Sequence, residues 1–177
     1  ALPESLPPAL RQPFTPRSVM RNYFSVISHA QFLHLALAMS FSFAGGFALY
    51  IGSASNFVMN ILHLPETSFG WMFIPMIMGM IIGAMFASKY ATAIRPASMI
   101  LIGYGVMGIA ALSNVLYNAL FVATIPWAIL PLMVYSAGVS ITSPVLTVMA
   151  LELFPEHKGL CSSLQSFLQM MLFAVVS

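Results

Sequence analysis

The sequence predicts an all-α protein that crosses a membrane several times, and three observations support this fold class. Hydrophobic residues make up 60% of the 177 residues and charged residues only 6%, whereas a soluble domain averages about 25% charged residues. All six Lys and Arg residues lie in short segments that precede or separate long apolar runs. The runs without Asp, Glu, Lys or Arg are residues 22–65, 67–88, 96–151 and 159–177.

The lengths of these runs predict the number of membrane crossings. A bilayer core about 30 Å thick requires roughly 20 apolar residues of helix. The run from 96 to 151 therefore fits two crossings separated by a short turn at 123–126. All the runs are too long and too uniformly apolar for the strands of a membrane barrel. We expect five membrane-spanning helices at about residues 31–59, 69–90, 97–121, 127–151 and 159–177.

The residues before the first span divide into two parts. Residues 1–15 are polar and rich in proline, which predicts a cytoplasmic linker. Thr15 and Pro16 form a typical helix start, and apolar residues then recur at helical spacing. We expect an amphipathic helix at 16–29 that lies on the membrane surface and leads into the first span. That span is long for a bilayer, so we expect it to tilt or to bend, for example at Gly45-Gly46.

The basic residues also predict an orientation. Lys and Arg occur before the first span, between the second and third, and between the fourth and fifth. These loops lie on one side of the membrane, and the loops on the other side contain neither residue. Cytoplasmic loops carry the excess of Lys and Arg. We therefore expect a multi-pass protein of a bacterial inner membrane with its N-terminal segment in the cytoplasm.

Several function classes are excluded or disfavoured by composition. Six basic residues and a net charge of +2 are too few for a nucleic-acid interface. The single cysteine, Cys161, excludes an internal disulfide. No Ser/His/Asp or metal-ligand spacing is present, so we expect no enzyme activity, no metal and no cofactor. Every acidic residue lies in a loop or near an interface, so we expect the carboxylate of any proton coupling to lie outside these residues.

The last span carries a polar face that is the main candidate site. Gln165 and Gln169 are one helical turn apart, with Ser162 and Ser166 on the same face. In a membrane such side chains either line an aqueous path or join helices through hydrogen bonds. We expect these four residues to line a substrate cavity.

The fourth span contributes Tyr135, Ser140 and Ser143 as further cavity candidates. Pro144 follows them directly and leaves a helical carbonyl without its usual donor. This proline is either a functional hinge or a static kink, and the residues leave both interpretations open. The remaining candidates are Tyr50 and Ser53 near the outer end of the first span for the cavity, and Gly79, Gly83, Gly103 and Gly105 for close helix packing.

Several motifs resemble the major facilitator transporters, and in particular their bicyclomycin/chloramphenicol-resistance (Bcr/CflA) drug-efflux branch. The opening Pro3-Glu4-Ser5-Leu6 and basic linker are similar to the central cytoplasmic loop of these proteins. In that branch a Phe-Pro, a Gly, a Ser and a Phe-Leu-Gln recur at one spacing across the last cytoplasmic loop and the eleventh helix. The matching residues here are Phe154-Pro155, Gly159, Ser162, Leu164 and Phe167-Leu168-Gln169.

The segment Ser53-Ala54-Ser55-Asn56-Phe57-Val58 is similar to the Ser-Gly-Ser-Pro-Phe-Val of the seventh helix. The sequence departs from the branch at Asn56, where Pro is usual, and at Gln165 and Ser166, where Leu and Gly are usual. The two additional polar groups are expected to alter the substrate range.

The resemblance covers nearly the whole chain and implies helices seven to eleven of twelve. It implies most of the C-terminal six-helix bundle of a proton-coupled multidrug efflux transporter that works by alternating access. The implied partners are protons, a small amphipathic drug-like substrate, the lipid bilayer and a missing N-terminal half of the same polypeptide. Two alternatives remain open, namely a membrane scaffold or assembly protein without transport activity and an importer of the same fold.

Overall fold

The structure is a computed structural model that describes residues 16–48, 59, 65, 69–122 and 124–176. In these residues the regular elements are helical. The elements are α1 (Pro16–Ile27), α2 (Ala30–Phe43), the π-helical turn η2 (Ala44–Ala48), α4 (Gly70–Tyr90), α5 (Pro96–Leu120), α6 (Leu130–Glu152), the 3-10 turn η5 (Pro155–His157) and α7 (Lys158–Val176).

Five helical segments are long and apolar enough to cross a bilayer, which confirms the predicted all-α membrane fold class. They are Ala30–Phe47, Gly70–Tyr90, Pro96–Leu120, Leu130–Glu152 and Pro155–Val176. Each overlaps one of the spans expected from the sequence. The first expected span continues to residue 59, and its residues 49–58, with Tyr50 and Ser53, lie outside the described part of the chain.

Local sequence signals account for several helix ends. The helix α2 begins after His29, whose Nδ1 accepts a hydrogen bond from the Phe32 backbone N–H at 3.4 Å. The helix α5 begins at Pro96, which suits the first helical position because it has no N–H to leave unpaired. Arg95 before it is extended, as a residue preceding proline prefers. At Ala44 the first span changes from α-helix to the π-helical turn η2, which contains Gly45 and Gly46. Such a local change of winding often occurs at functional sites.

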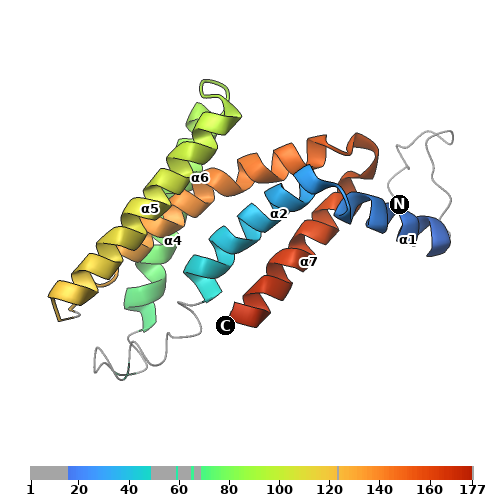
Figure 1. Ribbon diagram of the computed structural model, residues 1–177. Helices are drawn as coiled ribbons and strands as arrows, with labels where there is room; N and C mark the ends of the chain where they lie inside the picture. Colours follow the sequence, from blue (N-terminus) through green and yellow to red (C-terminus); the bar gives the residue numbers. More distant parts are fainter. Residues whose placement is uncertain (1–15, 49–58, 60–64, 66–68, 123, 177) are drawn as a thin grey trace, which may run out of the picture.

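The helix α6 lies at the centre of the arrangement (Figure 1). The helices α4 and α5 pack against one side of it, while α2 and α7 pack against each other and against its other side. Consecutive helices α4 and α5 are therefore held together mainly through α6.

Glycines allow α4 and α5 to approach the backbone of α6 closely. A Cβ atom at Gly79 would overlap the carbonyl oxygen of Met133, and one at Gly83 would overlap that of Ala137. In the same way, a Cβ atom at Gly103 of α5 would overlap Thr142 Oγ1. In lipid there is little hydrophobic force between helices, so such close van der Waals packing is a main source of association.

Gly105 differs from these three glycines. It is exposed, and a Cβ atom there would meet no atom within 4 Å in the described part of the chain. The packing role expected for Gly105 therefore has no counterpart among the described helices. Its position two residues after Gly103 places it on the opposite side of α5, away from α6.

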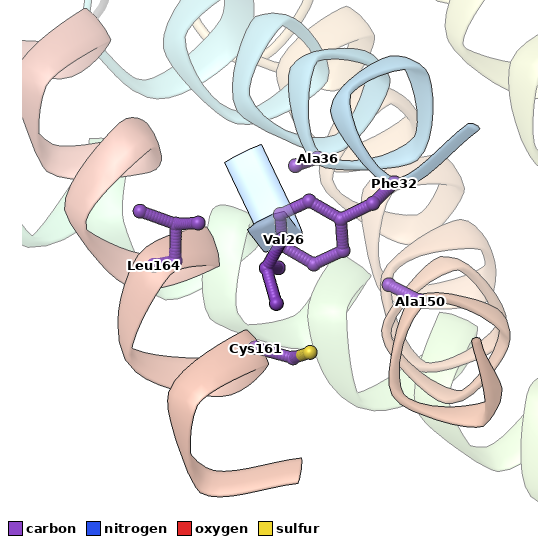
Figure 2. Close-up of a cluster of buried hydrophobic side chains, with 6 residues drawn as sticks. All are labelled: Val26, Phe32, Ala36, Ala150, Cys161 and Leu164. Carbon is purple, nitrogen blue, oxygen red and sulfur yellow. The ribbon is translucent and has the colours of Figure 1, made fainter. Parts of the chain in front are cut away.

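The end of the bundle that carries the basic segments has its own apolar core (Figure 2). Phe32 of α2 and Val26 of α1 lie among small and branched side chains from α6 and α7. The helix α1 is thus anchored on the bundle, and the Tyr23 hydroxyl also contacts Ser163 Oγ at 3.0 Å. Met20 and Phe24 on the other side of α1 are 71% and 73% exposed. The residues of this core are Val26, Phe32, Ala36, Ala150, Cys161 and Leu164.

Large apolar side chains cover the outer faces of α4 and α5. They include Ile81, Met85, Leu112 and Val115, each more than half exposed. Contiguous apolar surface of this extent is not stable in water, but it is the natural surface of a helix that faces lipid.

We predict that Gly79→Ala and Gly103→Ala destabilise the bundle and that Gly105→Ala does not. The first two methyl groups overlap atoms of α6, and such overpacking typically costs about 1–3 kcal/mol. The third enters open space and favours helix by up to about 1 kcal/mol. Thermal unfolding in detergent measures the effect, and it is followed as loss of the monodisperse peak in size-exclusion chromatography. Equal melting temperatures for all three variants would contradict the packing described here.

Candidate functional site

The polar side chains between α2, α6 and α7 form the candidate site. The four residues expected on one face of α7 occupy three different environments. Gln165 is only 3% exposed, Gln169 is half-buried, and Ser162 and Ser166 are exposed. The polar face therefore turns from the packed interior at Gln165 to an open surface at the two serines.

The Gln165 amide joins three helices. Its Nε2 donates hydrogen bonds to the Met39 sulfur of α2 and to Thr147 Oγ1 of α6, the latter at 3.3 Å. Thr147 Oγ1 in turn donates to the same Met39 sulfur at 3.4 Å. The Gln165 carbonyl oxygen Oε1 is buried and has no hydrogen-bond partner among the described residues. An acceptor left unsatisfied in this way costs about 1–3 kcal/mol, so it binds readily to any donor that reaches it.

A second polar group lies farther along α2 towards η2. The Tyr135 hydroxyl of α6 donates to the Ser42 carbonyl oxygen at 2.8 Å. The Tyr104 hydroxyl of α5 donates to the Ala38 carbonyl oxygen at 3.1 Å and accepts a hydrogen bond from Ser42 Oγ at 3.1 Å. The ring of Tyr135 fits against η2 because Gly46 has no side chain, since a Cβ atom there would overlap the ring.

Two other candidates of α6, Ser140 and Pro144, lie away from these two groups. Ser143 is half-buried, and Pro144 lies inside the helix on an exposed face. Ser140 and Pro144 both line a cavity of about 470 Å³ between α4, α5 and α6. Buried Ser136 joins α6 to α4, because its Oγ donates to the Met76 carbonyl oxygen at 2.9 Å. The proline candidate thus borders a cavity that is separate from the Gln165 cluster.

The chemistry available to these groups is hydrogen bonding without fixed charge. The charged residues that the structure describes in α4 to α7 lie at helix ends and are exposed. Within the described residues no three His, Cys, Asp or Glu side chains are close enough to hold a metal ion. The arrangement can hold a small molecule through amides, hydroxyls and apolar surface.

Sequence reasoning missed Met39, Ser42 and Tyr104 as parts of the site. Ser42 and Tyr104 are polar residues within apolar spans, and their polarity was the available signal. Met39 had no signal, because an apolar residue on an apolar helix is normally a packing residue. Its sulfur becomes a hydrogen-bond acceptor only because α6 and α7 bring Thr147 and Gln165 to it.

We predict that Tyr135→Phe lowers the free energy of unfolding by about 1 kcal/mol, because it removes the hydroxyl bond to α2 and leaves the Ser42 carbonyl without this donor. Tyr90→Phe is a matched control, since the Tyr90 hydroxyl has no hydrogen-bond partner in the described part of the chain. Thermal unfolding of both variants in the same detergent measures the difference. A melting temperature for Tyr135→Phe equal to that of Tyr90→Phe would show that the bond contributes nothing.

Comparison with known proteins agrees with this architecture of long apolar helices around neutral polar groups. A search of curated proteins finds none that matches the chain. The sequence profile of the Major Facilitator Superfamily, however, matches residues 2–177, which is nearly the full length. The members of this family are transporters and not enzymes. The chain therefore belongs to the major facilitator superfamily of multi-pass membrane transporters.

Proposed function

We propose that the chain is the C-terminal half of a proton-coupled multidrug efflux transporter that works by alternating access. The observation that carries this proposal is the neutral polar cluster of Gln165, Thr147 and Met39, placed between α2, α6 and α7 in an otherwise apolar bundle. A fixed charge in the cavity would favour one class of polar solute. Neutral amide and hydroxyl groups beside apolar walls suit small amphipathic molecules of varied shape instead.

The exposed face of α7 supports the presence of an opposing half. Ser162, Ser166 and Phe167 are exposed on it, whereas Cys161 and Leu164 of the same helix are buried in the core. A face with two hydroxyl groups is less favourable against lipid than against water. This face of α7 is suited to line a water-filled cavity between two six-helix halves. Half-buried Gln169 would then contact both that cavity and the interior of the bundle.

The acidic residues support a coupling site elsewhere in the transporter. Glu152 and Glu156 are exposed at the ends of α6 and η5. Proton coupling requires a carboxylate whose pKa responds to conformation, and burial away from water provides that response. Neither residue is buried, so we propose that the coupling carboxylate lies outside the described residues.

We predict that Gln165→Leu and Gln169→Leu change the drug profile more than the amount of protein. Leucine fills a similar volume, and at Gln165 the loss of the two Nε2 hydrogen bonds is offset by removal of the unsatisfied Oε1, so we expect only a small change in folding. Loss of one hydrogen bond to a bound drug changes its affinity by about tenfold. Resistance to a panel of drugs, normalised to membrane protein level, measures the effect. Gln31→Leu, an exposed glutamine at the start of α2, is the control.

The same experiment separates efflux from the two alternatives. A scaffold or assembly protein would give no resistance above background in any variant. An importer would increase drug sensitivity. If both leucine variants lose protein in proportion to resistance, the glutamines only hold helices together, and the cavity assignment is wrong.

We further propose an orientation in which the basic ends of the helices face the cytoplasm. Exposed Arg95 lies between α4 and α5, and exposed Pro65 lies on the loop that precedes α4. In a background with Cys161→Ala, we predict that an impermeant thiol reagent added to intact cells labels Pro65→Cys and not Arg95→Cys. Disrupted cells provide the control for reactivity. The reverse labelling pattern would overturn the orientation.

A further inference from the structure

Two rows of side chains meet where α2 and η2 pack against α7, and we call this contact the α2–α7 seam (Figure 1). Near the start of the seam, Gln165 of α7 bonds to the Met39 sulfur of α2. Two turns farther along α7, the centroid of the Phe173 ring lies 6.1 Å from that of Phe43. Residues four apart share one side of a helix. The rows are Met39, Phe43 and Phe47 on α2 and η2, and Gln165, Gln169 and Phe173 on α7.

The polar end of the seam lacks a hydrogen-bond donor. Both hydrogen bonds of the Gln165 amide use Nε2, so its buried Oε1 accepts none from the described residues. One turn along α7, half-buried Gln169 forms no hydrogen bond within the described part of the chain. A molecule with an N–H or O–H group therefore gains a hydrogen bond here without breaking one that the protein already makes.

The other end of the seam is aromatic. The Phe43 ring stacks on that of Phe47 with a centroid distance of 4.8 Å. Phe47 is buried in an apolar core, whereas Phe43 and Phe173 are half-buried and keep part of each ring free. Aromatic rings favour offset-stacked or edge-to-face contact with one another, so this end of the seam suits an aryl group.

The spacing and the charge of the seam define the ligand further. Gln165 and Phe173 are eight residues apart along α7, or roughly 12 Å at 1.5 Å per residue. All six side chains of the two rows are uncharged. A permanent cation at the Gln165 end would lose its hydration with no anion to replace it, and burial of an unpaired charge is costly. A neutral donor avoids that cost.

We propose that the α2–α7 seam selects substrates that carry an aryl group and, roughly 12 Å from it, an uncharged hydroxyl or N–H donor. The donor bonds to Gln165 Oε1, and the aryl group packs against Phe43 and Phe173. This inference rests on the proposed function, because it states which molecules the transporter accepts. It deepens that function by making Gln165 a specificity-determining residue that favours neutral donors over permanent cations.

Equilibrium dialysis of the purified protein in detergent tests this selection, with protein-free micelles as the blank. The reference probe is phenylhexanol with its ring and hydroxyl at opposite ends of the chain. We expect it to bind about tenfold more tightly than its methyl ether, which has no O–H, and than phenylhexyl trimethylammonium. Cyclohexylhexanol, which keeps the hydroxyl but has no aromatic ring, should bind about threefold more weakly than the reference.

Two variants, each with a matched control, assign the two ends. Gln165→Leu should bind the alcohol and the ether equally, whereas Gln31→Leu at the exposed start of α2 should keep the preference. Phe173→Leu should remove the preference for phenyl over cyclohexyl. Phe167→Leu, at a position of the same helix that is 57% exposed, should keep it. The wild-type comparisons and the Phe173 pair carry the test if Gln165→Leu fails to fold.

The proposal is overturned if wild-type protein binds alcohol and ether equally, or if Gln165→Leu keeps the preference for the alcohol. Tighter binding of the ammonium probe would also overturn it, because the phenylalanine rings would then hold a cation. Binding is measured without transport, so the proposed function fails separately. The expected preferences in a protein that gives no drug resistance would support the seam and contradict efflux, whereas resistance without these preferences would contradict the seam alone.

Discussion

Close backbone contact between α6 and its neighbours α4 and α5 is the interaction on which the rest of the structure depends. Gly79 and Gly83 place α4 against carbonyl groups of α6, and Gly103 does the same for α5. Gly138 of α6 completes the contact, because a Cβ atom there would lie 2.8 Å from the Gly103 carbonyl oxygen. In a bilayer, where helix association cannot rely on the hydrophobic effect, this contact fixes the rotation of α6 about its own axis.

The fixed rotation of α6 determines which of its polar groups meet the first and last spans. Ser136 turns towards α4, and Thr142 bonds back to the Gly138 carbonyl oxygen at 2.9 Å. Tyr135 and Thr147 turn to the other side, where they contact α2 and, through Gln165, α7. A single helix therefore presents a packing face to α4 and α5 and a polar face to α2 and α7. The candidate site at Gln165 and the cavity between α4, α5 and α6 both follow from this division.

Family membership places this division in a functional context. A major facilitator transporter requires a rigid bundle that moves as a unit and a surface that a mobile substrate can bind. The glycine contacts meet the first requirement for α4, α5 and α6. The neutral groups of α6 and α7 suit the requirement for a substrate-binding surface. Among them, the buried Gln165 carbonyl oxygen lacks a hydrogen-bond donor, so a donor on the substrate would stabilise it most.

The sequence by itself determined the fold class and the five membrane-length helices, because hydropathy and charge act locally, through the transfer of each residue into lipid. It also determined local ends such as the start of α5 at Pro96, where the proline ring sets the backbone. The tertiary structure decided which side of each helix is buried. Gly103 packs while Gly105 does not, and Gln165 is buried while Ser166 beside it is exposed. Helical spacing groups residues on a face, but only the neighbouring helices decide whether that face meets protein, lipid or water.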